Sequence, residues 1–120
     1  MNIDDQDISK SFIAVASDYI QMAEDVESAR NHAYLAVIAW NLSLYPQNMI
    51  SEQISIIAGE YEKSNPGVIQ AKLLAHDLQL LVDKKQKKFP NLRRTITKIG
   101  VEEHGDQYKI TTESIPFKVQ

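Results

Sequence analysis

The sequence predicts an α+β fold: a bundle of about four helices followed by a C-terminal antiparallel β-hairpin packed on it. Apolar residues recur at steps of three and four through most of the chain, as they do along amphipathic helices. After Phe89-Pro90 the period changes to two, and a turn at His104-Gly105-Asp106 divides the alternating stretch. No internal repeat or Pro/Gly/Ser-rich linker interrupts the 120 residues, so we expect a single domain over 1–120.

Two helices are expected in the first part of the chain, over about 7–27 and 28–45. The second is apolar on nearly every side from Ala33 to Leu44, which is typical of a central helix, and Pro46 ends it. Residues 24–30 contain no strong helix breaker, so one continuous helix remains an alternative. The first helix has an apolar stripe and aspartates that can cap its start: Ile8, Phe12, Val15, Tyr19 for the stripe, and Asp4, Asp5, Asp7 for the cap.

Two further helices are expected over about 48–62 and 66–88. Asn65-Pro66 suits the start of the last helix, with Asn65 as N-cap and Pro66 in the first helical position. This last helix has two apolar rows, Ile69, Leu73, His76, Leu80 and Leu74, Leu78, Leu81.

Strands are expected over about 93–102 and 107–113, and a separate short strand over 115–119 is an alternative after a break near Ser114. Alternation puts Thr95, Thr97, Ile99 and Val101 on one face and Ile96 on the other. A two-stranded hairpin is marginal alone, so its apolar side chains must rest on the helices or pair with another chain. They form a candidate apolar interface: Ile96, Ile99, Val101, Tyr108, Ile110.

Composition excludes several classes of protein. The chain has no cysteine, so disulfides, thiolate metal sites and thiol catalysis are excluded. The acidic start lacks the basic region of a secretory signal, and the longest apolar run is far shorter than the roughly 20 residues of a membrane span. We therefore expect a cytoplasmic protein without membrane association. Residues 1–62 hold ten acids and two bases, whereas residues 63–120 hold eleven bases and six acids, a segregation that can steer association.

No catalytic, cofactor-binding or metal-binding site is predicted. The four glycines are isolated and form no phosphate loop, and no two histidines share a helix turn. A metal or catalytic site would need His32, His76 and His104 to converge with a carboxylate such as Glu24, Asp25 or Asp77. Three histidines on three different elements indicate a structural or surface role instead.

The most distinctive polar feature is a basic segment that contains seven bases and no acid between residues 84 and 101. It is a candidate phosphate-contacting patch, in which Phe89 is the one aromatic residue able to stack on a base. Lysines at a helix C-terminus also bind the last carbonyls and suit the helix dipole, and an overall pI near 5.5 argues against a dedicated nucleic-acid binder. The bases are Lys84, Lys85, Lys87, Lys88, Arg93, Arg94, Lys98.

The favoured hypothesis is a small intracellular, non-enzymatic module that binds another protein or a second copy of itself. Its basis is the missing catalytic constellation, the surplus of apolar residues and the segregated charge. The first alternative is a nucleic-acid-associated protein that uses Lys84–Lys98. The second is an enzyme whose site is assembled from His32, His76 and a carboxylate.

Overall fold

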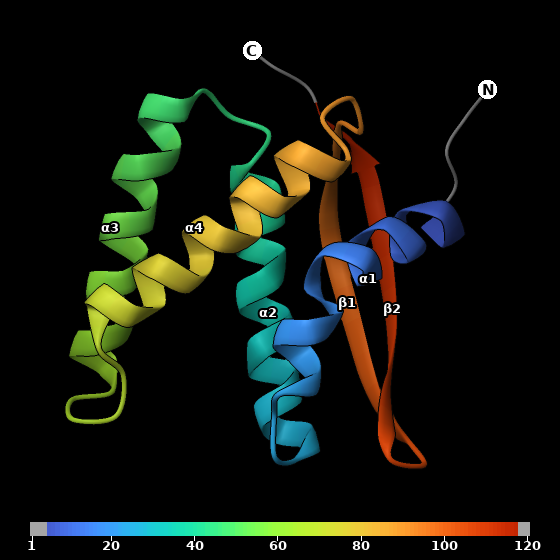
Figure 1. Ribbon diagram of the computed structural model, residues 1–120, viewed down its shortest axis with the longest axis horizontal. Helices are drawn as coiled ribbons and strands as arrows, with labels where there is room; N and C mark the ends of the chain where they lie inside the picture. Colours follow the sequence, from blue (N-terminus) through green and yellow to red (C-terminus); the bar gives the residue numbers. More distant parts are fainter. Residues whose placement is uncertain (1–4, 118–120) are drawn as a thin grey trace.

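The structure, a computed structural model, describes residues 5–117, with side chains from Ile8 onward. The predicted α+β class and the order of elements are confirmed (Figure 1). The capping carboxylates expected at Asp4, Asp5 and Asp7 lie outside the described part. The elements are α1 (Asp5–Gln21), α2 (Val26–Leu42), α3 (Gln47–Ser64), α4 (Ala71–Lys88), β1 (Arg94–His104) and β2 (Gln107–Pro116).

The first two helices are separate, which decides the alternative that the sequence left open. Asp25 stands in an extended conformation at the N-cap of α2, and its carboxylate accepts a hydrogen bond from the Ser28 backbone N–H at 2.7 Å. This bond holds the pKa of the Asp25 carboxyl below its usual value. This cap starts a new helix after the turn that follows α1, so the chain reverses its direction between the two helices.

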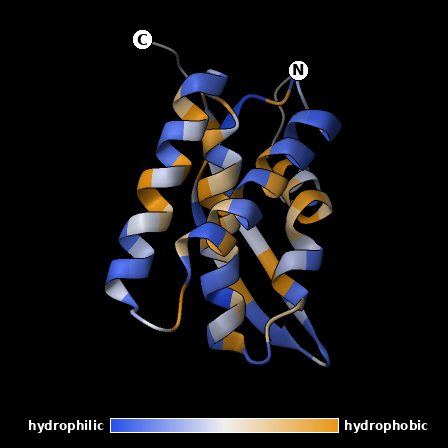
Figure 2. Ribbon diagram, turned by 60° about the vertical axis from the view of Figure 1, so that its left-hand side comes forward, coloured by the Kyte–Doolittle hydropathy of each residue, from blue (hydrophilic) through white to orange (hydrophobic). Residues whose placement is uncertain are grey.

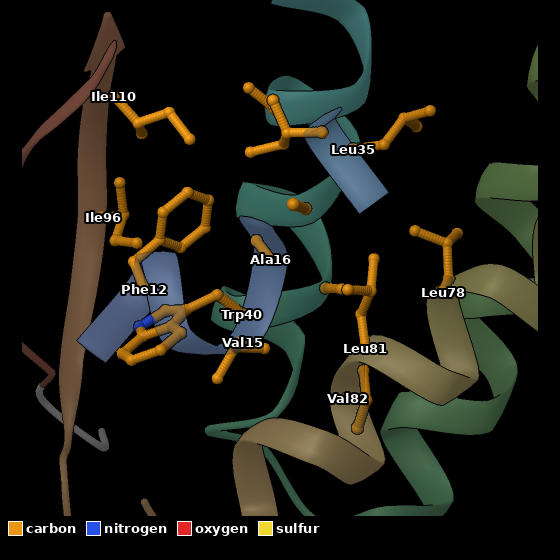
Figure 3. Packing of buried hydrophobic residues seen from close by; sticks show 14 of the residues in the cluster. Phe12, Val15, Ala16, Leu35, Trp40, Leu78, Leu81, Val82, Ile96 and Ile110 are labelled. Atoms are coloured by element: carbon orange, nitrogen blue, oxygen red, sulfur yellow. The ribbon is translucent and has the colours of Figure 1, made fainter. Parts of the chain in front are cut away.

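Helix α2 is the central helix, as expected from its apolar composition. It contacts α1, α4 and β1, and α4 crosses in front of it in Figure 1. Its alanines Ala29, Ala33 and Ala39 have no exposed surface, and their small side chains allow the neighbouring elements to come close. Figure 3 shows Trp40 of α2 beside Phe12 of α1 and near Ile96 of β1, at the junction of helices and hairpin.

Helix α4 begins at Ala71, so the start predicted at residue 66 is wrong. The Asn65 side-chain amide donates to the Tyr61 carbonyl at 3.0 Å, so it caps the end of α3 and does not start α4. Gly67 then turns the chain with a φ of +79°. The Ala71 backbone N–H, at the start of α4, donates to a carboxylate oxygen of Glu62 at 2.9 Å.

The two strands form an antiparallel hairpin whose register shifts between Ile96 and Lys98. Thr97 is the extra residue of this β-bulge. Without the bulge, Ile96 and Val101 would point to opposite faces because five positions separate them. With it, both are buried against the helices, so the expected placement of Ile96 on the opposite face from Val101 is wrong.

The return strand β2 runs unbroken to Pro116, so no separate strand starts after Ser114. Thr112 and Ser114 are buried and continue the inward alternation of Ile110, whereas Ile115 is exposed. Ile115, one of the apolar residues that suggested a new strand, therefore belongs to the outer face of β2. Residues 118–119 of the expected piece lie outside the described residues.

The hairpin is fastened to the helices at both of its outer edges. On the β1 side, the Asn41 amide donates to the Ile96 carbonyl at 3.0 Å and accepts from the Ile96 N–H at 2.8 Å. On the β2 side, the Ser9 hydroxyl accepts from the Thr112 N–H at 3.2 Å. These polar contacts satisfy strand groups that a third strand would otherwise bind.

Helix α3 lies at the periphery and packs mainly against α4 (Figure 1). Figure 2 shows a hydrophobic stretch in the loop that joins α3 to α4. No helix within residues 5–117 has the length and apolar character needed to cross a membrane.

Candidate functional site

The basic segment is largely built into the fold. Lys85 is buried, with 2% of its surface exposed, and its ammonium donates to the Leu92 carbonyl at 2.7 Å. The same ammonium lies 5.2 Å from the centre of the Trp40 ring. Lys85 therefore joins the loop after α4 to the core, and its ammonium is not accessible to a nucleic acid.

The two arginines also bind backbone carbonyls of their own chain. The Arg93 guanidinium donates to the Leu44 carbonyl at 3.2 Å and lies 5.0 Å from the Phe117 ring. The Arg94 guanidinium donates to the Ser114 hydroxyl at 2.9 Å and to the Ser114 carbonyl at 3.0 Å. Both side chains join the start of β1 to neighbouring segments.

The remaining lysines are spread along the surface. Lys84 lies 3.8 Å from Asp18 and Lys98 lies 3.6 Å from Glu113, as exposed ion pairs. Lys87 and Lys88 are exposed and form no ion pair with a described residue. Lys85 is therefore inaccessible to a phosphate, and the structural interpretation of the segment accounts for Lys85, Arg93 and Arg94.

Lys85 provides a testable pH dependence. Burial, with a smaller effect from Arg93, lowers the pKa of the Lys85 ammonium to about 8. We expect the fluorescence of Trp40, the one tryptophan of the chain, to change with a midpoint near pH 8 as this ammonium loses its proton. Since the unfolded chain binds more protons between pH 8 and about 10, this lysine makes the folded state gain stability as the pH rises through that range.

The matched variant for this titration is Lys85→Met, which keeps an unbranched side chain one atom shorter than lysine and removes the charge. An ordinary α-amino group titrates in the same range, so only a step that disappears in Lys85→Met belongs to Lys85. A fluorescence step that persists in the variant would contradict the assignment.

The predicted apolar interface lies inside the molecule. Ile96, Val101 and Ile110 are buried, and Ile99 and Tyr108 pack partly buried against the same core. These side chains rest on the protein's own helices, which was one of the two expected possibilities for the hairpin. The surface available to a partner must therefore be sought elsewhere.

The histidines do not converge. His32 is half-buried on α2, whereas His76 lies exposed on α4 and His104 exposed at the end of β1. No group of three or more metal-ligating side chains is found among the described residues. Of the carboxylates considered with the histidines, Asp25 is the cap of α2, and Asp77 lines the same hollow as His32.

A hollow of about 350 Å³ opens where the end of α1, the start of α2 and the start of α4 meet. Its polar side includes Tyr19, His32 and Asp77, and its apolar wall includes the loop residue Val68 and Leu73 of α4. A second hollow of about 270 Å³ lies further along α4, between α4 and α1. The two hollows share Tyr19 and Asp77 in their linings, so they adjoin, and we call the pair of hollows the α1/α4 groove.

Large apolar side chains are exposed along this groove. Val68 is 81% exposed and Leu73 59% exposed beside the first hollow. Met22 is 72% exposed and Leu80 54% exposed beside the second. A run of exposed apolar residues along a concave surface is typical of an interaction site.

Tyr19 and His32 form the polar centre of the groove. Their rings stack with centroids 4.6 Å apart, and the His32 Nδ1 lies 3.0 Å from the Tyr19 carbonyl oxygen. A carbonyl can only accept, so Nδ1 carries the hydrogen. Burial, and next the charge of Asp77, raise the pKa of the Tyr19 phenol to about 12 and keep it protonated.

Sequence reasoning recognised the apolar row of Leu73 and Leu80 but did not place it on the surface. The row of Leu74, Leu78 and Leu81 faces the core, and the other row, with His76, faces solvent. The sequence signal that could have located the groove is a helix with two apolar rows, because the core buries one row and leaves the other on the surface.

A comparison with protein families finds no match, and searches of curated proteins and of solved structures find none either.

Proposed function

We propose that the protein is a small cytoplasmic binding module that docks another protein in the α1/α4 groove. The observation that carries the proposal is the exposure of four large apolar side chains along two adjoining hollows, at Met22, Val68, Leu73 and Leu80. Covering them removes apolar surface from water, at about 25 cal/mol per Å².

The groove supports binding better than it supports catalysis. His32 and Asp77 face one hollow, where His32 donates from Nδ1 to the Tyr19 carbonyl and Tyr19 keeps its proton, and the other exposed side chains of the groove are mainly apolar. A mostly apolar surface with few polar groups is typical of recognition.

The nucleic-acid alternative is weakened by the roles of the basic residues. Lys85, Arg93 and Arg94 each donate to groups of their own chain, and among the described bases of the segment Lys87 and Lys88 are the two that form neither such a bond nor an ion pair. Two phosphate contacts would contribute little salt-dependent affinity.

The proposal predicts that the double variant Leu73→Ser/Leu80→Ser loses a protein partner that the wild type retrieves from its native cytosol, by at least about tenfold. Both leucines are more than half exposed, so the variant should keep its stability within about 0.5 kcal/mol. Recovery is measured by quantitative mass spectrometry with a tagged chain, after nuclease treatment.

The matched control is Met49→Ser/Ile56→Ser, which removes two exposed apolar side chains of α3 that do not line the groove. If both double variants retrieve the partner equally, the groove is not the docking site. If recovery disappears with nuclease and with Lys87→Gln/Lys88→Gln, the nucleic-acid alternative replaces the proposal. Light scattering on the purified chain shows whether the partner is a second copy.

A further inference from the structure

Asp77 indicates which chemical groups a partner must bring, because it lines both hollows. It is half-buried, and no described residue gives it a hydrogen bond or an ion pair. A carboxylate that loses water when a partner covers it must be compensated by a cation or by donors from that partner. The groove therefore favours a ligand with a positive charge at its centre.

The surroundings of Asp77 add to this preference. Asp18 lines the second hollow, where Lys84, 3.8 Å from Asp18, is the one basic side chain among the described residues of the lining. No lysine or arginine of the described part of the chain lines the first hollow, in which Asp77 lies with Tyr19 and His32. Asp77 therefore keeps an unbalanced negative charge between two apolar surfaces.

The walls of the groove indicate the form of the ligand. Helices α1 and α4 line the second hollow, and α2, α4 and the loop before α4 line most of the first. Backbone groups inside helices are already bonded to each other, so recognition here depends on side chains and not on strand addition. A helix laid along α4 matches such a groove.

The spacing of the apolar anchors fits two turns of a helix. Leu73 and Leu80 are seven residues apart on α4, which corresponds to about 10 Å along its axis. A partner helix presents apolar side chains at the same interval when they stand at positions i and i+7, with i+3 or i+4 between them. The intermediate position comes opposite Asp77, halfway between Leu73 and Leu80.

We propose that the occupant of the α1/α4 groove is a basic amphipathic helix of the partner protein, with apolar side chains in both hollows and a lysine or arginine paired with Asp77. This inference rests on the proposed function and specifies its ligand. The ion pair forms in a partly desolvated site, where it contributes more to specificity than an exposed pair does.

The test is selection from a displayed library of 18-residue helices whose outward faces are randomised, against the purified full chain. We expect enriched sequences to carry two apolar residues seven positions apart and a lysine or arginine three or four positions after the first. Selection against Asp77→Asn should keep the apolar pair and lose the basic residue. An enriched peptide should bind Asp77→Asn at least about tenfold more weakly than the wild type by fluorescence anisotropy.

The outcomes separate this inference from the proposed function. Groove-dependent binders without a basic residue, or with the same basic residue after selection on Asp77→Asn, would overturn the inference and leave the docking groove in place. Peptides that bind the Leu73→Ser/Leu80→Ser variant as tightly as they bind the wild type would overturn the inference that the ligand is a helix. A selection that enriches no peptide at all would overturn it as well. The partner recovered from cytosol then decides separately whether the groove itself is functional.

Discussion

Replacing Trp40 with alanine is expected to lower the free energy of unfolding by about 3–5 kcal/mol, a large share of the stability of an ordinary domain. Trp40 is 1% exposed and meets Phe12 edge-on with ring centroids 6.0 Å apart. Its indole N–H donates to the Arg94 carbonyl at 2.9 Å, and the Lys85 ammonium lies over its ring. The variant therefore leaves a cavity and an unpaired carbonyl together, and urea denaturation followed by circular dichroism measures the loss.

Two control variants separate the contributions of Trp40. Trp40→Phe keeps an aromatic ring but loses the bond to Arg94, so we expect a smaller loss of about 1–2 kcal/mol. Tyr34→Ala removes an exposed aromatic residue of the same helix and should change stability by less than about 1 kcal/mol. A Trp40→Ala midpoint close to that of Tyr34→Ala would show that Trp40 does not hold helices and hairpin together.

The four helices and the hairpin could be predicted because their signals are local. Apolar spacing and the turn at His104-Gly105-Asp106 depend on neighbouring residues alone. Boundaries that depend on capping contacts were harder to place. The Asn65 side chain can cap either end of a helix, and its bond to the Tyr61 carbonyl, which ends α3, exists only once α3 has formed.

The faces of the hairpin were predicted less well because the β-bulge at Thr97 has no distinctive sequence. Ile96 and Val101 both reach the core only because one residue is unpaired between them. The bulge lies beside α2, where Asn41 binds the backbone of Ile96, far away in the sequence. A strict alternation of residues could not include that constraint.

The candidate sites show the same division between local and distant information. The basic segment was visible as a run of charge, but the carbonyls that Lys85, Arg93 and Arg94 bind come from Leu92, Leu44 and Ser114. In the same way, the apolar row of Leu73 and Leu80 was visible in the sequence, but its exposure was not. In the folded protein α4 packs against α1 and α2, and its other apolar row, with Leu78, is the buried one. Which patch is open to a partner is a property of packing.

Asn41→Asp is expected to cost about 2–3 kcal/mol at neutral pH, because it changes one of the two bonds to Ile96 into a repulsion. In the wild-type protein, the Asn41 side-chain amide donates to the Ile96 carbonyl at 3.0 Å and accepts from the Ile96 N–H at 2.8 Å. A carboxylate can still accept, but its second oxygen faces the carbonyl. The amide proton of Ile96 should exchange faster with solvent as β1 loosens from α2.

The pH dependence of this variant gives the sharpest test of the contact. The repulsion raises the pKa of the new carboxyl in the folded state, and its protonated form can donate to the Ile96 carbonyl again. The difference in stability from wild type should therefore shrink as the pH falls from about 7 to about 4. Asn31→Asp, at an exposed position of the same helix, is the matched control and should stay within about 0.5 kcal/mol of wild type. Equal, pH-independent effects of the two variants would mean that Asn41 does not fasten β1 to the helices, and that the bulge is fixed by the core alone.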